Sequence, residues 1–252
     1  MSILDKFRLD GQVAIVTGAT SGLGIPIACA LAEAGADIVL AGRRADRLKG
    51  TASLVQERGR RALRVQTDIS SPADCQALAK EAAIFGPVGV LVNNAGIATA
   101  IPASRETPKE FQSVLDVNLS GAYWMAQAAA SVMNDGGSII NISSAIGLVT
   151  AGLPQAAYSA SKAGLLGLTR DLAGQWSSRK NIRVNAITPG YFISEMSDTF
   201  ADGYLESRVK TLPIPRVGDG GELAAAVLFL ASAGASYITG ATLTVDGGLT
   251  IS

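Results

Sequence analysis

Short apolar runs alternate with longer amphipathic stretches along the whole chain. Runs of about four to eight apolar, branched residues are typical of strands buried on both faces, whereas apolar residues at helical spacing are typical of helices that cover a sheet. The runs predict strands at Val13–Thr17, Asp37–Ala41, Ala62–Thr67, Val90–Asn93, Ser138–Ser143, Arg183–Thr188 and Thr242–Val245. The amphipathic stretches predict helices near residues 23–34, 44–58, 72–85, 108–133, 155–178 and 220–231.

This order of elements predicts an α/β fold, a doubly wound parallel sheet with helices on both faces. No internal repeat or low-complexity linker interrupts the pattern, so we predict a single Rossmann-type domain over residues 1–252. The least regular stretch, Pro189–Pro215, mixes aromatic residues with prolines. It predicts an irregular substrate lid at about residues 190–215, and a surface excursion with a helix of its own is the alternative.

Charge is balanced, with 21 basic and 21 acidic residues and no run of one sign, which argues against nucleic-acid and membrane partners. Charged residues make up only 17% of the chain, against roughly 25% in a soluble domain, so we expect other subunits to cover part of the surface. The first residues lack the basic and apolar regions of a secretion signal, and no apolar stretch approaches the ~20 residues of a membrane span. We therefore expect a cytoplasmic protein.

Histidine is absent, which removes the commonest general base and the commonest metal ligand. Cys29 and Cys75 each stand alone, so the sequence offers neither a CxxC pair nor a metal cluster, and we expect two buried, reduced thiols. No metal site is predicted. Proton transfer therefore has to use other groups.

A glycine-rich turn, TGATSGLG, joins the first predicted strand to the first predicted helix. Gly18, Gly22 and Gly24 allow the backbone to turn tightly and to approach a pyrophosphate, while the helix N-terminus offers free N–H groups. A glycine pattern alone could be a simple tight turn. Its place between strand and helix predicts a dinucleotide site.

The end of the second strand reads VLAGRRADRL, with Gly42 where an acidic residue would bind a ribose 2′-hydroxyl. Arg43 and Arg44 follow and could bind a 2′-phosphate instead, and Ser21 could add a hydroxyl contact. This pattern favours NADP(H) over NAD(H), although loop arginines are also common as surface charge. Asp68, after the third strand, either contacts the adenine or caps the helix that starts near Pro72.

Tyr158 and Lys162 stand four residues apart in YSASK, on one face of a predicted helix. A free phenol titrates near about 10, and a nearby ammonium stabilises the phenolate, so this pair suits acid–base chemistry. Taken alone, the spacing also fits an ordinary amphipathic pair.

Six motifs together resemble the classical short-chain dehydrogenase/reductase family over essentially the whole chain. They are TGATSGLG, NNAG at residues 93–96, DVNLSG with Asn118, INISS with Ser144, YSASK, and ITPG at Ile187–Gly190. The resemblance implies seven parallel strands in the order 3-2-1-4-5-6-7, with the site at their carboxyl ends. The number of predicted strands agrees with this.

The resemblance also implies roles for individual residues. Tyr158 is the acid/base, Ser144 positions the substrate oxygen, Lys162 holds the nicotinamide ribose and lowers the tyrosine pKa, and Asn118 supports a water-linked proton relay. Ser143 is a rival to Ser144, but the S-x-x-G pattern favours the later residue. The implied cofactor-binding residues are Gly18, Thr20, Ser21, Gly22, Leu23, Gly24, Arg43, Arg44, Asp68, Ile69, Asn94, Ala95, Gly96, Tyr158, Lys162, Pro189, Gly190, Ile193 and Ser194.

The substrate is predicted only as a class, a small carbonyl compound or alcohol. The segments Ala145–Leu153 and Tyr191–Tyr204 are mostly apolar or aromatic, which favours a neutral, fairly apolar ketone or secondary alcohol. The 3-oxoacyl-carrier-protein reductases and the sugar or gluconate dehydrogenases are similar in general appearance, and both stay open as alternatives. A non-catalytic NADP-binding sensor is disfavoured because the tyrosine and lysine are both present. The resemblance implies a homotetramer, with small residues such as Ala126 and Gly174 allowing helices to approach.

Overall fold

Seven parallel strands form the centre of the computed structural model, which describes residues 2–134, 136–150, 152–195 and 203–252. Their order is β3-β2-β1-β4-β5-β6-β7, as predicted. Each strand begins and ends within three residues of its expected bounds. The strands are β1 (Val13–Thr17), β2 (Asp37–Gly42), β3 (Ala62–Gln66), β4 (Val88–Asn93), β5 (Gly137–Ile142), β6 (Ile182–Pro189) and β7 (Thr242–Val245).

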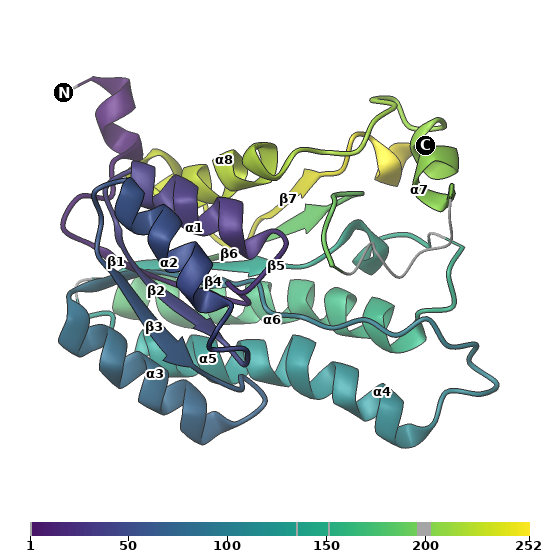
Figure 1. Cartoon of the computed structure of the whole chain (residues 1–252), viewed down its shortest axis with the longest axis horizontal. Coiled ribbons are helices and arrows are strands. Elements are labelled where there is room, and N and C mark those ends of the chain that lie inside the picture. Colours follow the sequence, from purple (N-terminus) through teal and green to yellow (C-terminus); the bar gives the residue numbers. More distant parts are fainter. Residues whose placement is uncertain (1, 135, 151, 196–202) are drawn as a thin grey trace.

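Helices cover both faces of this sheet (Figure 1). They are α1 (Gly24–Glu33), α2 (Leu48–Glu57), α3 (Pro72–Phe85), α4 (Pro108–Leu115), α5 (Gly121–Ala130), α6 (Ala156–Lys180), α7 (Tyr204–Val209) and α8 (Gly220–Ala231). Short 3-10 helices lie at Ile3–Phe7, Ala145–Gly147, Ala233–Ala235 and Leu249–Ile251. None of the helices in the described ranges is long and apolar enough to cross a membrane.

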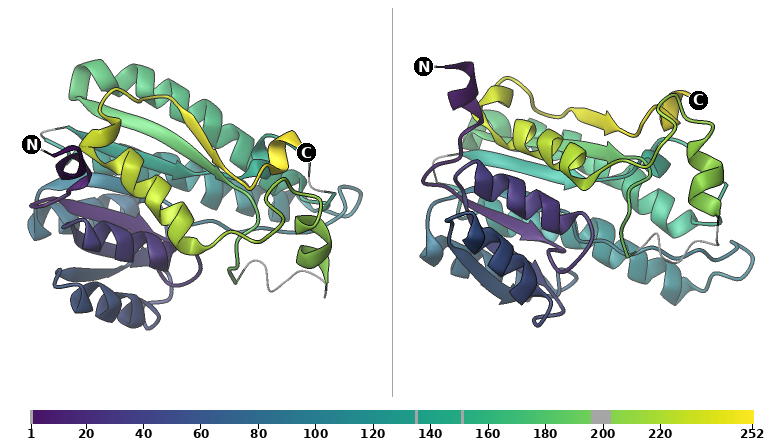
Figure 2. Two further views of the ribbon diagram at one scale, coloured as in Figure 1. Left: turned by 90° about the horizontal axis from the view of Figure 1, so that it is seen from above. Right: turned by 45° about the horizontal axis from the view of Figure 1, so that its top comes forward.

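Side chains of β1 alternate between the two layers, which explains why its five residues are all buried. Ala14 and Val16 pack into a core with α1, α2 and α8, whereas Val13 and Ile15 pack into a second core with α3, α5 and α6. Successive strand side chains point to opposite faces, so a strand covered on both faces must be apolar throughout. The two layers are seen from further directions in Figure 2.

The strand order reverses between β1 and β4, which lie side by side although β2 and β3 separate them in sequence. The chain moves outward from β1 through β2 to β3 and then returns to start β4 on the other side. The loops that leave β1 and β4 therefore diverge, and a crevice opens at the carboxyl ends of these strands.

Two predicted helices differ from the structure. The helix expected over residues 108–133 divides into α4 and α5, joined by a π-helical turn at Asp116–Ser120. That turn widens the helix where the buried Asn118 side chain bonds to a neighbouring loop. The helix expected from residue 44 begins instead at Leu48, because Arg44–Arg47 form a turn closed by the Arg47 N–H and the Arg44 carbonyl.

The expected lid over residues 190–215 contains a helix, α7, and residues 196–202 lie outside the described part. Beside α7, the side chains of Tyr191, Val209 and Leu212 form a small core of their own, with Tyr204 and Leu249 packed against it. The described part of this segment is thus a packed excursion with its own helix, the alternative left open above. Its function as a lid stays a prediction.

Candidate active site

The glycine-rich turn after β1 adopts a backbone that requires glycine. Gly18 has φ +67° and Gly22 has φ +56°, in the left-handed region that other residues rarely adopt. Gly24 starts α1 so close to the turn that an added Cβ would lie 2.4 Å from the Gly18 carbonyl oxygen. Ser194 packs over the same turn, since a Cβ on Gly22 would lie 3.1 Å from its Cβ. The turn leaves backbone N–H groups at the N-terminus of α1, the arrangement that binds phosphates.

Asn94, the first residue after β4, holds this turn in place. Its Nδ2 donates to the Thr17 carbonyl at 2.9 Å and to the Gly18 carbonyl at 3.2 Å. The Thr17 hydroxyl oxygen accepts in return from the backbone N–H groups of Asn94 and Ala95, at 3.0 and 3.1 Å. The NNAG segment therefore supports the floor of the crevice.

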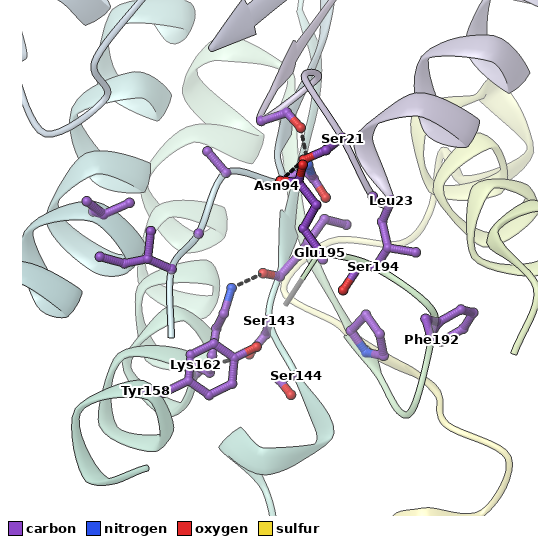
Figure 3. Close-up of a pocket in the computed structure, with 18 of the residues that line it drawn as sticks. Ser21, Leu23, Asn94, Ser143, Ser144, Tyr158, Lys162, Phe192, Ser194 and Glu195 are labelled. Carbon is purple, nitrogen blue, oxygen red and sulfur yellow. Dashed lines mark hydrogen bonds between the residues drawn. The ribbon is translucent and has the colours of Figure 1, made fainter. Parts of the chain in front are cut away.

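Tyr158 and Lys162 lie on one face near the start of the 25-residue helix α6, as the spacing predicts. Both side chains are buried, and Lys162 Nζ lies 5.6 Å from the centre of the Tyr158 ring. Lys162 Nζ donates to the Ile142 carbonyl at the end of β5, at 2.8 Å. Burial lowers the pKa of the Lys162 ammonium to about 8. Figure 3 shows the tyrosine, the lysine and Ser144 together at one end of the pocket.

Burial raises the pKa of the Tyr158 phenol, and a hydrogen bond with Ser144 acts in the opposite direction. The expectation that Lys162 lowers this pKa stays a prediction. The ring is desolvated, and the lysine ammonium donates a hydrogen bond to the Ile142 carbonyl. At neutral pH the phenol keeps its proton.

The two neighbouring serines after β5 have different partners. Ser143 Oγ donates to the Lys162 carbonyl at 2.7 Å, which ties β5 to α6. Ser144 Oγ accepts from the Ile146 N–H at 3.2 Å and also bonds with Tyr158, so it faces the same end of the cavity as the phenol. The geometry favours Ser144 as the reactive neighbour, as the sequence pattern does.

Asn118 links the loop after β4 to α6. Its Nδ2 donates to the Ile97 carbonyl at 2.8 Å and to Ser161 Oγ at 3.0 Å, and its Oδ1 accepts from the Ile97 N–H at 2.8 Å. Both amide hydrogens are thus used within the fold. The side chain therefore fixes the loop after β4 against α6, and the water-linked relay stays a prediction.

One cavity of about 450 Å³ connects the turn with the tyrosine, a size usual for small-molecule and cofactor sites. Almost all of the predicted site residues line it: Gly18, Thr20, Ser21, Gly22, Leu23, Arg43, Arg44, Asp68, Ile69, Asn94, Ala95, Gly96, Ser144, Tyr158, Lys162, Pro189, Gly190 and Ser194. Gly24 and Asn118 lie beneath its wall, and Ile193 is 73% exposed outside it. No group of residues suited to a metal ion occurs among the described positions.

Asp68 lines the cavity, but it does not cap α3. Its carboxylate accepts from the Ser70 N–H and hydroxyl, at 3.0 and 2.7 Å. The cap of α3 is Ser71, whose hydroxyl accepts from the Asp74 N–H. The capping alternative is therefore wrong, and an adenine contact stays a prediction.

Sequence reasoning missed Glu195, which lines the cavity beside Ser21, away from Tyr158 (Figure 3). Its carboxylate accepts from Ser21 Oγ at 2.8 Å and from Arg44 Nη2 at 2.6 Å, and it also pairs with Arg47. These hydrogen bonds, from Arg44 first and then Ser21, hold the pKa of Glu195 at about 2. The arginine-rich loop was visible in the sequence, but Glu195 lies 151 residues after Arg44. Nothing local in the sequence therefore indicated that the two side chains pair.

Gln155 was also missed. It lies just before α6, lines the cavity and is 7% exposed. Its Oε1 is buried and accepts no hydrogen bond from any described residue. Such an acceptor costs about 1–3 kcal/mol unless a partner reaches it. In the sequence, the only indication that Gln155 belongs to the site was its position three residues before the predicted acid/base, Tyr158.

Fold and site together define a Rossmann-type oxidoreductase. A family model described as enoyl-(acyl carrier protein) reductase matches residues 18–250. The chain belongs to the short-chain dehydrogenase/reductase family, and the resemblance of its motifs is confirmed.

Individual relatives span nearly the whole chain. A galactitol 2-dehydrogenase (L-tagatose-forming) of Cereibacter sphaeroides is 41% identical, over 97% of this chain and 97% of its own. A 3-oxoacyl-[acyl-carrier-protein] reductase of Staphylococcus aureus is 38% identical, over 94% and 97%. A gluconate 5-dehydrogenase of Burkholderia cenocepacia, solved in complex with NADP and tartrate, is 36% identical with a TM-score of 0.93 over all of both chains.

Proposed function

We propose that this chain is an NADP(H)-dependent oxidoreductase that reversibly reduces a ketone to a secondary alcohol, with Tyr158 as the acid/base. The observation that carries the proposal is one cavity with two ends. The glycine turn and Arg44 lie at one end, and Ser144, Tyr158 and Lys162 at the other. The relatives named above support the same chemistry.

The residues present fit NADP(H). The turn offers N–H groups to a pyrophosphate, and Ser21 and Arg44 already hold an anion, the Glu195 carboxylate, where a 2′-phosphate is expected. When bound, NADPH supplies a hydride to the carbonyl carbon. The gluconate dehydrogenase complex with NADP supports this choice of cofactor.

Tyr158 donates its proton to the substrate oxygen in the reduction direction. The raised pKa keeps that proton on the phenol at neutral pH, and Ser144 can hydrogen-bond the same oxygen. Lys162 places a positive charge beside the ring, which favours the phenolate that forms as the proton leaves. In the oxidation direction the phenolate accepts the proton of the alcohol.

We expect alcohol oxidation to accelerate as the pH rises. The phenolate is the reactive form for oxidation. Because burial raises the pKa of Tyr158, the phenolate population still grows at the alkaline end of the pH range measured. The measurement is the single-turnover rate of NADP⁺ reduction between about pH 6 and 10. A flat profile, with an isotope effect showing that chemistry limits the rate, would contradict the assignment of Tyr158.

A polyhydroxylated substrate is the second candidate beside a simple ketone, and Gln155 favours it. Gln155 lines the cavity three residues before Tyr158, and its amide oxygen is buried with no partner among the described residues. Rotation of its side chain could present either a donor or an acceptor to a second hydroxyl group of the substrate. The galactitol and gluconate dehydrogenase relatives act on molecules of this kind. Reduction of a 3-oxoacyl thioester stays the alternative, supported by the Staphylococcus aureus relative.

The variant Gln155→Leu is expected to raise KM for a hydroxylated ketone about tenfold and to leave KM for an unsubstituted ketone of equal size nearly unchanged. Leucine keeps the approximate volume, and Gln155 makes no helix-capping bond that the change would remove. Steady-state kinetics on the matched pair of substrates measures the split. An equal change for both substrates would count against a hydroxyl contact.

We also propose a homotetramer and cytoplasmic action. Of the two small residues expected at helix contacts, Ala126 is buried inside the subunit, so it serves the core. Gly174 on α6 is exposed, with open space beside it, and supports an α6 contact between subunits. Sedimentation equilibrium determines the assembly.

The direct test of the proposed reaction follows NADPH absorbance while the purified protein meets aryl ketones, diketones, keto sugars and 3-oxoacyl thioesters. Consumption with one group identifies the substrate class. Tight NADPH binding without consumption of any substrate would favour a non-catalytic binding protein.

A further inference from the structure

The Glu195 carboxylate is held by side chains from two separate loops. Ser21 comes from the glycine turn after β1, and Arg44 and Arg47 come from the turn after β2. Arg44 Nη2 also donates to Thr20 Oγ1 at 3.1 Å and to Ser21 Oγ at 2.9 Å, so the donors form one cluster. Figure 3 shows Glu195 beside Ser21 above the pocket.

Two of these donors, Ser21 and Arg44, are among the residues expected to bind the 2′-phosphate of NADP(H). Carboxylate and phosphate oxygens accept the same kind of bond from a guanidinium group and from a hydroxyl. Ser21 has one hydrogen to donate, so it cannot serve both anions. Two anions held by the same donors also repel each other. Binding of the phosphate therefore requires Glu195 to leave the cluster.

We infer that Glu195 competes with the 2′-phosphate for Ser21 and Arg44 and so limits the preference of the site for NADP(H) over NAD(H). The inference rests on the proposed NADP(H) dependence. NAD(H) carries a 2′-hydroxyl there, so it can bind beside Glu195 without an anion to displace. The residue thus affects cofactor preference from the segment between β6 and α7.

Protonation does not release Glu195, because its neighbours keep it ionised throughout the physiological pH range. Release depends on exchange of one anion for another. Glu195 and Arg44 are each 44% exposed, so solvent screens the pair and the exchange is possible at a modest cost. The competition should therefore change affinity measurably without blocking the site.

The experiment measures binding of 2′-AMP and 5′-AMP to the full chain by calorimetry, for the wild type, Glu195→Gln and a control, Glu206→Gln. Glu206 is an exposed acid on α7 that pairs with no arginine in the described residues, so its variant loses the same charge from the same segment. We expect Glu195→Gln to bind 2′-AMP about tenfold more tightly, with 5′-AMP unchanged and Glu206→Gln like the wild type. The ratio of NADH to NADPH dissociation constants should rise by a similar factor.

Unchanged or weaker 2′-AMP binding by Glu195→Gln would overturn the inference. An equal increase in 2′-AMP affinity in Glu206→Gln would also overturn it. The effect would then come from the loss of one negative charge anywhere in this segment, and not from competition for Ser21 and Arg44. Both carboxylates are exposed, so neither variant should lose its fold, and a matching melting temperature checks this. The readout needs no turnover, so failure of the carbonyl-reduction test would leave this result interpretable.

Discussion

Replacing Tyr158 by phenylalanine is expected to lower turnover at least about a thousand-fold and to leave NADPH binding within about twofold of the wild type. The change removes the phenol oxygen that exchanges the proton with the substrate. The ring stays, and with it the packing of Tyr158 against Val114 and Ala157. Single-turnover absorbance measures the chemical step, and quenching of protein fluorescence by NADPH measures binding.

The control for this variant is Tyr123→Phe. Tyr123 is a half-buried tyrosine on α5 that packs against Trp124 and does not line the cavity. It tests the loss of a hydroxyl elsewhere in the fold, and we expect activity near that of the wild type. Residual activity of Tyr158→Phe above about a tenth of the wild type would remove the tyrosine from the role of acid/base.

Replacing Lys162 by methionine is expected to reduce turnover by at least about a hundred-fold without loss of stability at pH 7. The ammonium is buried beside Tyr158, and its pKa of about 8 against the ordinary value of 10.5 corresponds to about 3 kcal/mol of desolvation cost in the folded chain. Methionine removes this cost and so stabilises the folded chain, but it also removes the hydrogen bond to the Ile142 carbonyl. That loss offsets about 1–2 kcal/mol of the gain in stability. The variant should therefore melt at or above the wild-type temperature.

The pH dependence of this difference has a definite sign. Below about pH 8 the lysine is charged in both the folded and the unfolded chain, so the folded wild type carries the full cost. As the pH rises from about 8 to 10.5 the folded chain loses its proton first, and the cost disappears. Melting curves at pH 7 and pH 10 should show the advantage of Lys162→Met shrinking. A variant that keeps its activity would show that the lysine has no role in the reaction. A variant that melts well below the wild type at pH 7 would contradict the desolvation cost of the buried ammonium.

The strands could be predicted because both faces of the sheet are covered, whereas their order was implied only by the resemblance to the family. Nearly every residue of a strand such as β1 must then be apolar. That pattern can be recognised from the strand's own sequence, without knowledge of the segments that pack against it. The glycine turn was predictable for a similar local reason, since Gly18 and Gly22 adopt positive φ angles that few other residues tolerate.

Features that depend on contacts between distant segments could not be predicted. The π-helical turn at Asn118 arises from bonds to Ile97 and Ser161, which belong to other elements. A local choice was also missed: the Asp68 carboxylate binds Ser70, so Ser71 caps α3, and the sequence spacing alone did not separate the two candidates. The raised pKa of Tyr158 follows from burial that only the folded packing creates.

The central claim is hydride transfer from NADPH to a carbonyl carbon with the proton from Tyr158. Its most direct test uses NADPH deuterated at the transferable position of the nicotinamide, with the substrate that the panel identifies, and mass spectrometry of the product. The account predicts a single deuterium on the new carbinol carbon in the wild type and no labelled product from Tyr158→Phe. NADPH consumption that leaves the product unlabelled with either stereoisomer of the cofactor, or equal labelling in the variant, would contradict it.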